Sequence, residues 1–218
     1  MERIEKSKWK NKPILEIGSG ASGISDYYQG EVIGVDSDFA KTGTKKNTNI
    51  KYVEGLSDNL PFNNETFYLV VCLDTLEHLE KKLRIKTIRE LIRVTKKGGI
   101  IYLGFPTGNL SEKYEIKLNN AFKRINHKNH LWLIEHRKYG LPNYRRILSA
   151  IKNLGIPKEK IEILENVNIF IWFIMHMLFT VYPESFFSRI LKYAYLPIFF
   201  IAKIHLPPFY RIIFVINK

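Results

Sequence analysis

Three residues capable of acid–base chemistry follow a short apolar run in the first half of the chain. Asp74, Glu77 and His78 come directly after residues 69–73, which are all apolar. Carboxylates and an imidazole can transfer protons near neutral pH, and His78 is the preferred general base. The alternative is structural, because Glu77 and His78 could simply begin a helix.

The same residues can also be interpreted as half of a metal site. Carboxylate oxygens and imidazole nitrogens suit Mg²⁺, Mn²⁺ and Zn²⁺ in different degrees. Further histidines could complete the ligand set, namely His127, His130 and His136. We expect no metal, and the metal site stays open as an alternative.

A glycine-rich turn near the N-terminus is typical of a cofactor site. Residues 18–23 are G-S-G-A-S-G and follow an apolar run, so the backbone can turn sharply and approach a ligand near a helix N-terminus. Asp36 ends the next apolar run, eighteen residues after Gly18, where a carboxylate can accept both ribose hydroxyls. The predicted contacts from these two segments are Gly18, Ser19, Gly20, Asp36 and Ser37. This pattern alone also fits a nicotinamide dehydrogenase.

The elements that must position these residues alternate along the chain. Apolar runs predict strands at residues 14–17, 31–36, 50–53, 67–73, 100–105, 161–164 and 210–216. Helical spacing of apolar residues predicts a helix over 79–95, and another runs from Pro142 to about residue 153. Residues 109–126 form a basic helix or a long loop. Strands that alternate with helices predict an α/β fold with a parallel sheet.

Two longer motifs separate a methyltransferase from a dehydrogenase. Residues 60–79 are L-P-F-N-N-E-T-F-Y-L-V-V-C-L-D-T-L-E-H-L, and residues 90–99 are E-L-I-R-V-T-K-K-G-G. With Glu16 two residues before the first glycine, residues 13–106 resemble the small-molecule class I S-adenosylmethionine-dependent methyltransferases, which include ubiquinone- and menaquinone-biosynthesis-like enzymes.

The resemblance implies a Rossmann-like, seven-stranded sheet with helices on both faces and S-adenosyl-L-methionine as cofactor. It implies that Glu16 lies near the methionine end of the cofactor, and that Asp74, Glu77 and His78 lie near the transferred methyl group. Where the family has Gly-Asp-Ala before L-P-F, this chain has Gly-Leu56-Ser57. Leu56 and Ser57 are therefore expected beside the adenine without the family's aspartate, a role that Asp58 could take over.

Charge and hydropathy are unevenly distributed. The chain has a net charge of +13, of which residues 110–218 carry +10. Its single cysteine, Cys72, lies in the apolar run and is expected to be a buried, inert thiol. The charged N-terminus lacks a signal peptide, so we expect a cytoplasmic protein, peripheral on the inner face of the membrane.

Residues 166–183 contain no Asp, Glu, Lys or Arg, and aromatic residues interleaved with cations follow them. We expect a single domain in which residues 13–106 bind cofactor, 107–165 face the acceptor, 166–209 form an apolar helical insertion and 210–218 form the last strand. The insertion is expected to dock on an anionic membrane. A cap on the sheet and a homodimer surface are the alternatives.

The predicted function is O-methylation of a small-molecule or lipid-linked, hydrophobic acceptor at the membrane surface. One alternative is an RNA methyltransferase that uses the basic half as an electrostatic platform. Against nucleic acid, the chain has neither an N-P-P-Y-like tetrapeptide nor paired cysteines. The other alternative is a catalytically silent cofactor-binding or scaffold protein, which the missing aspartate at Leu56 favours.

Overall fold

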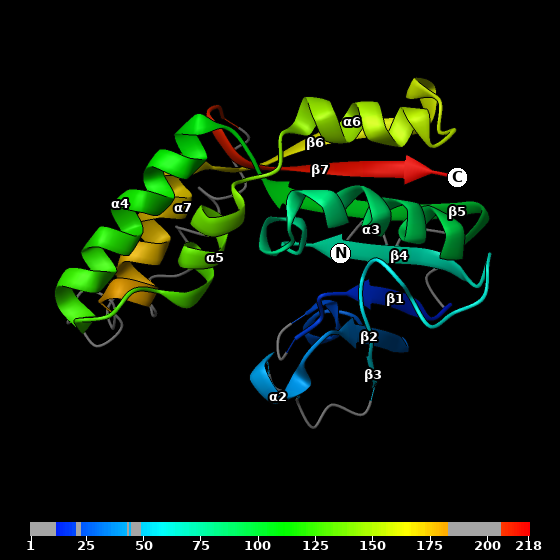
Figure 1. Cartoon of the computed structure of the whole chain (residues 1–218), viewed down its shortest axis with the longest axis horizontal. Coiled ribbons are helices and arrows are strands. Elements are labelled where there is room, and N and C mark those ends of the chain that lie inside the picture. Colours follow the sequence, from blue (N-terminus) through cyan, green and yellow to red (C-terminus); the bar gives the residue numbers. More distant parts are fainter. Residues whose placement is uncertain (1–11, 21–22, 43, 45–48, 183–205) are drawn as a thin grey trace.

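The computed structural model describes residues 12–20, 23–42, 44, 49–182 and 206–218. Seven strands form one sheet in the order β3-β2-β1-β4-β5-β7-β6 (Figure 1). The strands are β1 (Ile14–Ile17), β2 (Val32–Asp36), β3 (Ile50–Glu54), β4 (Phe67–Leu73), β5 (Thr95–Pro106), β6 (Ile161–Asn168) and β7 (Phe209–Asn217). β7 pairs antiparallel with both β5 and β6, while the pairs among β1 to β5 are parallel. The predicted α/β class and Rossmann-like sheet are confirmed.

The central strands of the sheet are buried on both sides, and both of their faces carry apolar side chains. Along β4, Leu69 and Val71 belong to one hydrophobic cluster while Val70 and Cys72 belong to the other, so consecutive side chains alternate between faces. The larger cluster is covered by α3 (Lys81–Val94) and α6 (Tyr144–Asn153), which lie together on one face (Figure 1). Cys72 is fully buried as expected, and burial raises the pKa of its thiol to about 12.

A group of helices lies beyond the carboxyl ends of the parallel strands (Figure 1). We call α4 (Asn109–Asn126), α5 (Leu131–Tyr139) and α7 (Ile169–His176) the helical lobe. Its own small core contains Leu118, Leu133, Ile169 and Trp172, and Trp172 stacks on Tyr210 of β7 with ring centroids 3.9 Å apart. The lobe is thereby fixed against the end of the sheet, where ligands bind in open α/β folds.

The segment after the glycine turn differs from the expected helix N-terminus. It contains only a three-residue 3₁₀ turn, η1 (Ile24–Asp26), and no α-helix is described between β1 and β2. Only eight residues, 24–31, remain before β2 begins at Val32, and they leave little room for a helix that must also return to the sheet. The dipole of a long helix is therefore not available to a ligand at this turn.

The apolar insertion begins later than predicted. β6 continues to Asn168, which pairs with Phe209 of β7, so residues 166–168 are strand rather than helix. The side-chain oxygen of Asn168 accepts hydrogen bonds from the amides of Phe170 and Ile171 at 2.9 and 3.3 Å, so it caps α7. A short π-helical turn, η4 (Met177–Val181), follows α7.

Most of the predicted membrane-docking segment, residues 183–205, lies outside the described residues. This includes the four phenylalanines on which that expectation rests, Phe186, Phe187, Phe199 and Phe200. Within the described part of the chain, no helix is both long and apolar enough to cross a membrane.

Candidate active site

The glycine turn lies at the carboxyl end of β1 and packs against the turn after β4. Gly18 has a φ of +71°, and a Cβ at this position would lie 2.4 Å from Oγ1 of Thr75. The Thr75 hydroxyl donates to the carbonyl oxygen of Ile17 at 3.0 Å. The positive φ and the contact with Thr75 both exclude a side chain at position 18. Gly18 therefore allows the predicted cofactor turn after β1 to pack against the turn after β4, where the predicted catalytic residues begin.

Asp36 lies at the end of β2 and is joined to the glycine turn. Its carboxylate accepts the amide of Gly20 at 3.1 Å through one oxygen and the amide of Asp38 at 3.1 Å through the other. The side chain is half-buried, and its neighbour Ser37 is exposed. This geometry brings Asp36, Gly18 and Gly20 together at one edge of the sheet, as the sequence predicted.

Glu16 is a buried carboxylate directly beneath this turn. One of its oxygens accepts the amide of Ile24 at 2.8 Å, whereas Oε2 has no hydrogen-bond partner among the described residues. Burial raises the pKa of Glu16 to about 7. A buried acidic oxygen without a donor fits a ligand that carries a cationic amino group.

We expect Glu16→Gln to stabilise the unliganded protein in alkaline solution. Because the folded pKa is raised above the unfolded value, the burial penalty is absent at low pH and grows as pH rises from about 4.5 to 7. At pH 8.5 the variant should gain about 1–3 kcal/mol of unfolding free energy over the native protein, and at pH 4.5 it should gain almost none. Urea denaturation at both pH values measures the difference.

Glu54→Gln serves as the control for this prediction because Glu54 is exposed on β3. It should change stability equally at both pH values. An equal gain for Glu16→Gln at both pH values would show that this carboxyl has the same pKa in the folded and the unfolded protein, and would contradict the raised pKa.

Leu56 and Ser57, the two residues expected near an adenine, differ in their exposure and in their hydrogen bonds. Leu56 is 57% exposed and offers no side-chain hydrogen bond. The hydroxyl of Ser57 lies 3.0 Å from that of Thr87 on α3, so its side chain is engaged with the helix. Any polar contact from Leu56 to a ligand would therefore come from its backbone.

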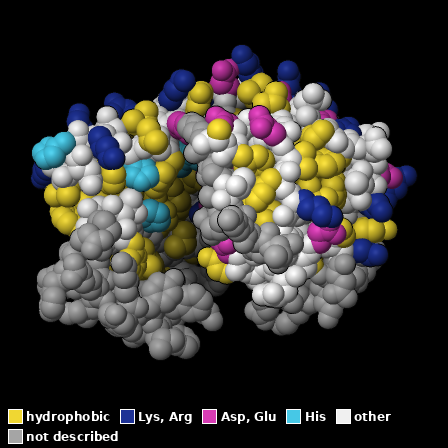
Figure 2. All heavy atoms as spheres, turned by 90° about the horizontal axis from the view of Figure 1, so that it is seen from below, with side chains coloured by type: hydrophobic (Ala, Val, Ile, Leu, Met, Phe, Trp, Pro, Cys, Tyr) yellow, Lys and Arg dark blue, Asp and Glu magenta, His cyan; other side chains and the backbone are white. Residues whose placement is uncertain are grey.

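A cavity of about 610 Å³ lies between the helical lobe and the carboxyl ends of the strands. The turn after β4 contributes Asp74 and the 3₁₀ turn η2 (Leu76–His78), and the opposite walls come from α5, α7 and the ends of β6 and β7. Seen from below, the visible histidine side chains lie on the helical-lobe side of the molecule, beside hydrophobic side chains (Figure 2). The cavity thus combines an aromatic wall with an ionisable floor.

Asp74 is held in a strained conformation at the mouth of this cavity. Its φ is +51°, its amide donates to the Gly104 carbonyl at 2.9 Å, and its carboxylate pairs with Arg211 of β7 at 2.6 Å. The side chain is 42% exposed and borders the cavity. Burial raises the pKa of Asp74, and the charge of Arg211 opposes the shift.

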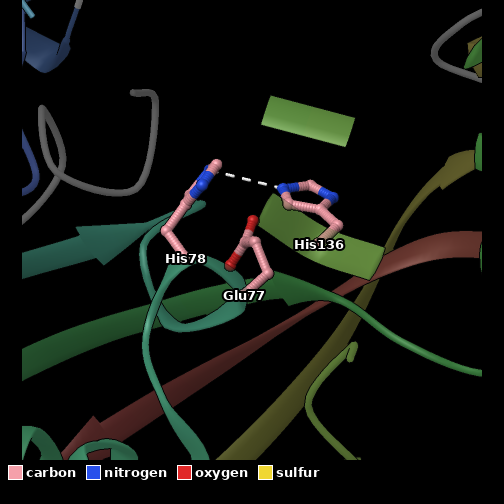
Figure 3. A group of neighbouring side chains, drawn as sticks. All are labelled: Glu77, His78 and His136. Atoms are coloured by element: carbon pink, nitrogen blue, oxygen red, sulfur yellow. Dashed lines mark hydrogen bonds between the residues drawn. The ribbon is translucent and has the colours of Figure 1, made fainter. Parts of the chain in front are cut away.

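His78 and His136 meet across the cavity floor (Figure 3). Their Nε2 atoms are 3.3 Å apart. Nδ1 of His78 bonds to Glu135 at 2.7 Å, and Nδ1 of His136 bonds to Glu115 at 3.0 Å. Burial lowers the pKa of His78, and the neighbouring His136 adds to the shift. Each imidazole is oriented by its own carboxylate and presents Nε2 to the other.

Glu77 extends toward the gap between the two rings (Figure 3). It is 1% exposed, and its Oε2 has no hydrogen-bond partner among the described residues. Burial raises the pKa of Glu77 well above its usual range, and the charge of Asp74 adds to the shift. Glu77, His78 and His136 each offer one atom that could bind a metal, and these three atoms lie within 4.8 Å of one another.

Of the three histidines that could have completed a ligand set, one lies in the cluster and two lie outside it. His136 joins Glu77 and His78, whereas His127 is the left-handed residue that ends α4 and His130 packs its ring against Phe122 and Trp132. The residues that sequence reasoning did not single out are Glu115, Glu135, His176, Tyr210 and Arg211. Glu115 had a detectable signal, because Ser111, Glu115 and Leu118 share the buried stripe of α4.

A family model described as "Methyltransferase domain" matches residues 15–103. No curated protein matches the chain. Phosphoethanolamine N-methyltransferase 2 of Haemonchus contortus, solved with S-adenosyl-L-methionine, has a TM-score of 0.59 at 19% identity. The match covers 95% of this chain and 49% of that one, so the chain spans about half the length of the Haemonchus enzyme.

Two shorter methyltransferases align over most of their length. A possible histamine N-methyltransferase from Thermotoga maritima has a TM-score of 0.60 at 12% identity, with 94% of this chain and 82% of that one covered. A methyltransferase from Archaeoglobus fulgidus, described as S-adenosylmethionine-dependent, has a TM-score of 0.57 at 14% identity, with 100% and 92% covered. At these identities the similarity shows the shared fold.

Proposed function

We propose that this chain, a class I S-adenosylmethionine-dependent methyltransferase, methylates an oxygen atom of a hydrophobic acceptor held in the cavity beneath the helical lobe. The observation that carries this proposal is the pair of oriented imidazoles on the cavity floor. An acceptor hydroxyl is a poor nucleophile until it loses its proton, and these side chains are suited to promote that loss.

The residues at the glycine turn fit the cofactor. Asp36 is positioned to accept ribose hydroxyls, and the unpartnered oxygen of Glu16 suits the amino group of the methionine portion. When bound, the cofactor supplies an electrophilic methyl carbon on a sulfonium. The protein's own contribution is to align the acceptor and to exclude water from it.

The cavity walls favour an acceptor that is largely apolar. Trp132, Val167 and Trp172 line it, and Arg211 contributes a buried Nε that has no hydrogen-bond partner among the described residues. That N–H can hold an oxygen of the acceptor next to the reacting hydroxyl. A hydroxylated ring with a second oxygen substituent meets both requirements.

An acceptor located in a membrane would also explain why α7 exposes apolar side chains. Phe170 and Ile174 are 46% and 55% exposed, on the helix that carries the cavity residues Trp172 and His176. The half of the chain that contains this helix has a net charge of +10, which favours an anionic membrane surface. We therefore propose that α7 brings the cavity to a membrane that contains the acceptor.

Methylation of an amine is the second candidate. The carboxylates of Asp74 and Glu77 together with the rings of Trp132 and Trp172 would suit an alkylammonium group. Two of the structural relatives are named as N-methyltransferases. An amine acceptor would still need to lose a proton at the same cluster.

The test measures demethylated cofactor released with three acceptors. These are an isoprenoid-substituted dihydroxybenzene in anionic vesicles, its short-chain water-soluble analogue, and a matched aromatic amine. We expect both dihydroxybenzenes to react, and we expect the lipid form to react faster on anionic than on neutral vesicles. Phe170→Ser with Ile174→Ser should slow only the vesicle reaction.

Each outcome separates the candidates. Turnover of the amine alone would replace oxygen by nitrogen as the methylated atom. Turnover on RNA alone would support an RNA methyltransferase. Cofactor binding without any turnover would support a catalytically silent cofactor-binding or scaffold protein. Equal rates on neutral and anionic vesicles would remove the membrane component and leave the oxygen acceptor in place.

A further inference from the structure

We propose that Glu77, His78 and His136 bind a divalent transition-metal ion, with Glu135 and Glu115 as the carboxylates that orient the two histidines. The proposal deepens the proposed function, because it assigns a cation to the site that would activate the acceptor. Cation binding can nevertheless be measured without any acceptor.

The hydrogen bonds of the two imidazoles leave their Nε2 atoms as ligands. Both Nδ1 atoms face carboxylates, Glu135 at 2.7 Å and Glu115 at 3.0 Å. Glu115 also accepts the hydroxyl of Tyr210 at 2.6 Å, so its carboxyl is held in place from a second side. When both imidazoles are neutral and donate from Nδ1 to their carboxylates, each Nε2 has a lone pair, and the two lone pairs point toward one another.

The separation of those nitrogens is that of two ligands on one ion. The Nε2 atoms lie 3.3 Å apart. Two nitrogens bound tetrahedrally to Zn²⁺ at about 2.0–2.1 Å lie roughly 3.3–3.4 Å from each other. Facing lone pairs repel at this distance, and a cation between them would replace that repulsion with two coordinate bonds.

Glu77 supplies the third ligand and an independent observation. Its carboxylate points toward the gap between the rings, is 1% exposed and has an unpartnered Oε2 among the described residues (Figure 3). A buried acidic oxygen without a donor is costly, and a bound cation would satisfy it. Among the described residues, these three form the one group of at least three metal-ligating side chains.

The donor set indicates the class of ion. Two imidazoles and one carboxylate suit Zn²⁺, Fe²⁺ or Mn²⁺, whereas Mg²⁺ and Ca²⁺ prefer oxygen ligands. Carboxylates on the far nitrogen of each ligating histidine are the usual outer partners of such ions. The cluster borders the cavity of about 610 Å³, so positions for water or an acceptor oxygen stay open on the cation.

Isothermal titration calorimetry of the chelator-treated full chain with Zn²⁺ and with Mn²⁺ tests the site. We expect one ion per chain and at least tenfold weaker binding of Mg²⁺. Glu77→Gln and His136→Ala should abolish binding, and Glu115→Gln should weaken it 10- to 100-fold. His176→Ala should bind normally, because His176 lines the same cavity outside the cluster.

A second measurement on the native chain covers the case in which a buried variant does not fold. In ¹⁵N NMR of the histidine side chains, Zn²⁺ should shift the Nε2 resonances of two histidines and leave His130 unchanged. Absence of stoichiometric binding, or binding that leaves all imidazole resonances in place, would overturn the proposal. Stoichiometric binding without any oxygen methylation would leave the cation site standing and remove the proposed acceptor.

Discussion

Replacing His78 with alanine is expected to lower kcat by about 10²- to 10⁴-fold, the usual contribution of a group that promotes proton loss. The imidazole lies on the cavity floor, 2.7 Å from Glu135 and 3.3 Å from His136, and its removal takes away the cluster's most accessible nitrogen. Steady-state kinetics on the best acceptor, at saturating cofactor, measures the loss.

The cofactor's dissociation constant separates a catalytic from a structural effect in this variant. It should change less than about twofold, because His78 takes no part in the hydrogen bonds that join Asp36 to the glycine turn. His130→Ala is the matched control, since its ring packs against Phe122 and Trp132 outside the cluster. Undiminished kcat in His78→Ala, or equal losses in the two variants, would contradict a role for the cluster.

Asp36→Ala is expected to weaken binding of the cofactor by about 1–3 kcal/mol, which corresponds to about a 5- to 150-fold increase in Kd. The substitution leaves two ribose hydroxyls without an acceptor. It also removes the acceptor for the Gly20 amide, which loosens the glycine turn. Calorimetry with S-adenosylmethionine and with its demethylated product measures the change, and NADH should not bind to the native chain.

Asp38→Ala provides the comparison for Asp36, because the backbone amide of Asp38 rather than its side chain contacts the Asp36 carboxylate. That variant should keep the native Kd within about twofold, since the backbone bond survives truncation of the side chain. If Asp36→Ala bound the cofactor as tightly as the native chain, the ribose would have to be recognised elsewhere.

The cofactor half of the protein was largely predictable from local sequence. Strands β1 and β4 have the predicted bounds, because short apolar runs between turn residues carry their own signal. The glycine turn and Asp36 could be paired in advance because parallel neighbours end at the same edge of a sheet. The turn after it was harder to predict, since whether a helix forms depends on how soon β2 must begin.

Elements without such a local signal were placed less well. Residues 131–139 form α5, although their mixture of histidines, aromatics and basic residues was predicted only as an acceptor-side segment. The strand β6 extends into the apolar insertion because its pairing with β7 continues to Asn168. Tertiary hydrogen bonding overrode local composition at that boundary.

By itself, the sequence determined the fold class, the match of residues 15–103 to a methyltransferase domain and the position of Asp74, Glu77 and His78 after a buried strand, because each depends on residues close together in the chain. Only the tertiary structure decided which residues complete the site. His136, Glu115 and Tyr210 belong to α5, α4 and β7, and they converge only because the helical lobe packs over the end of the sheet. Contacts between elements so far apart in the chain depend on packing, so no local spacing could single out His136 from the two histidines before it.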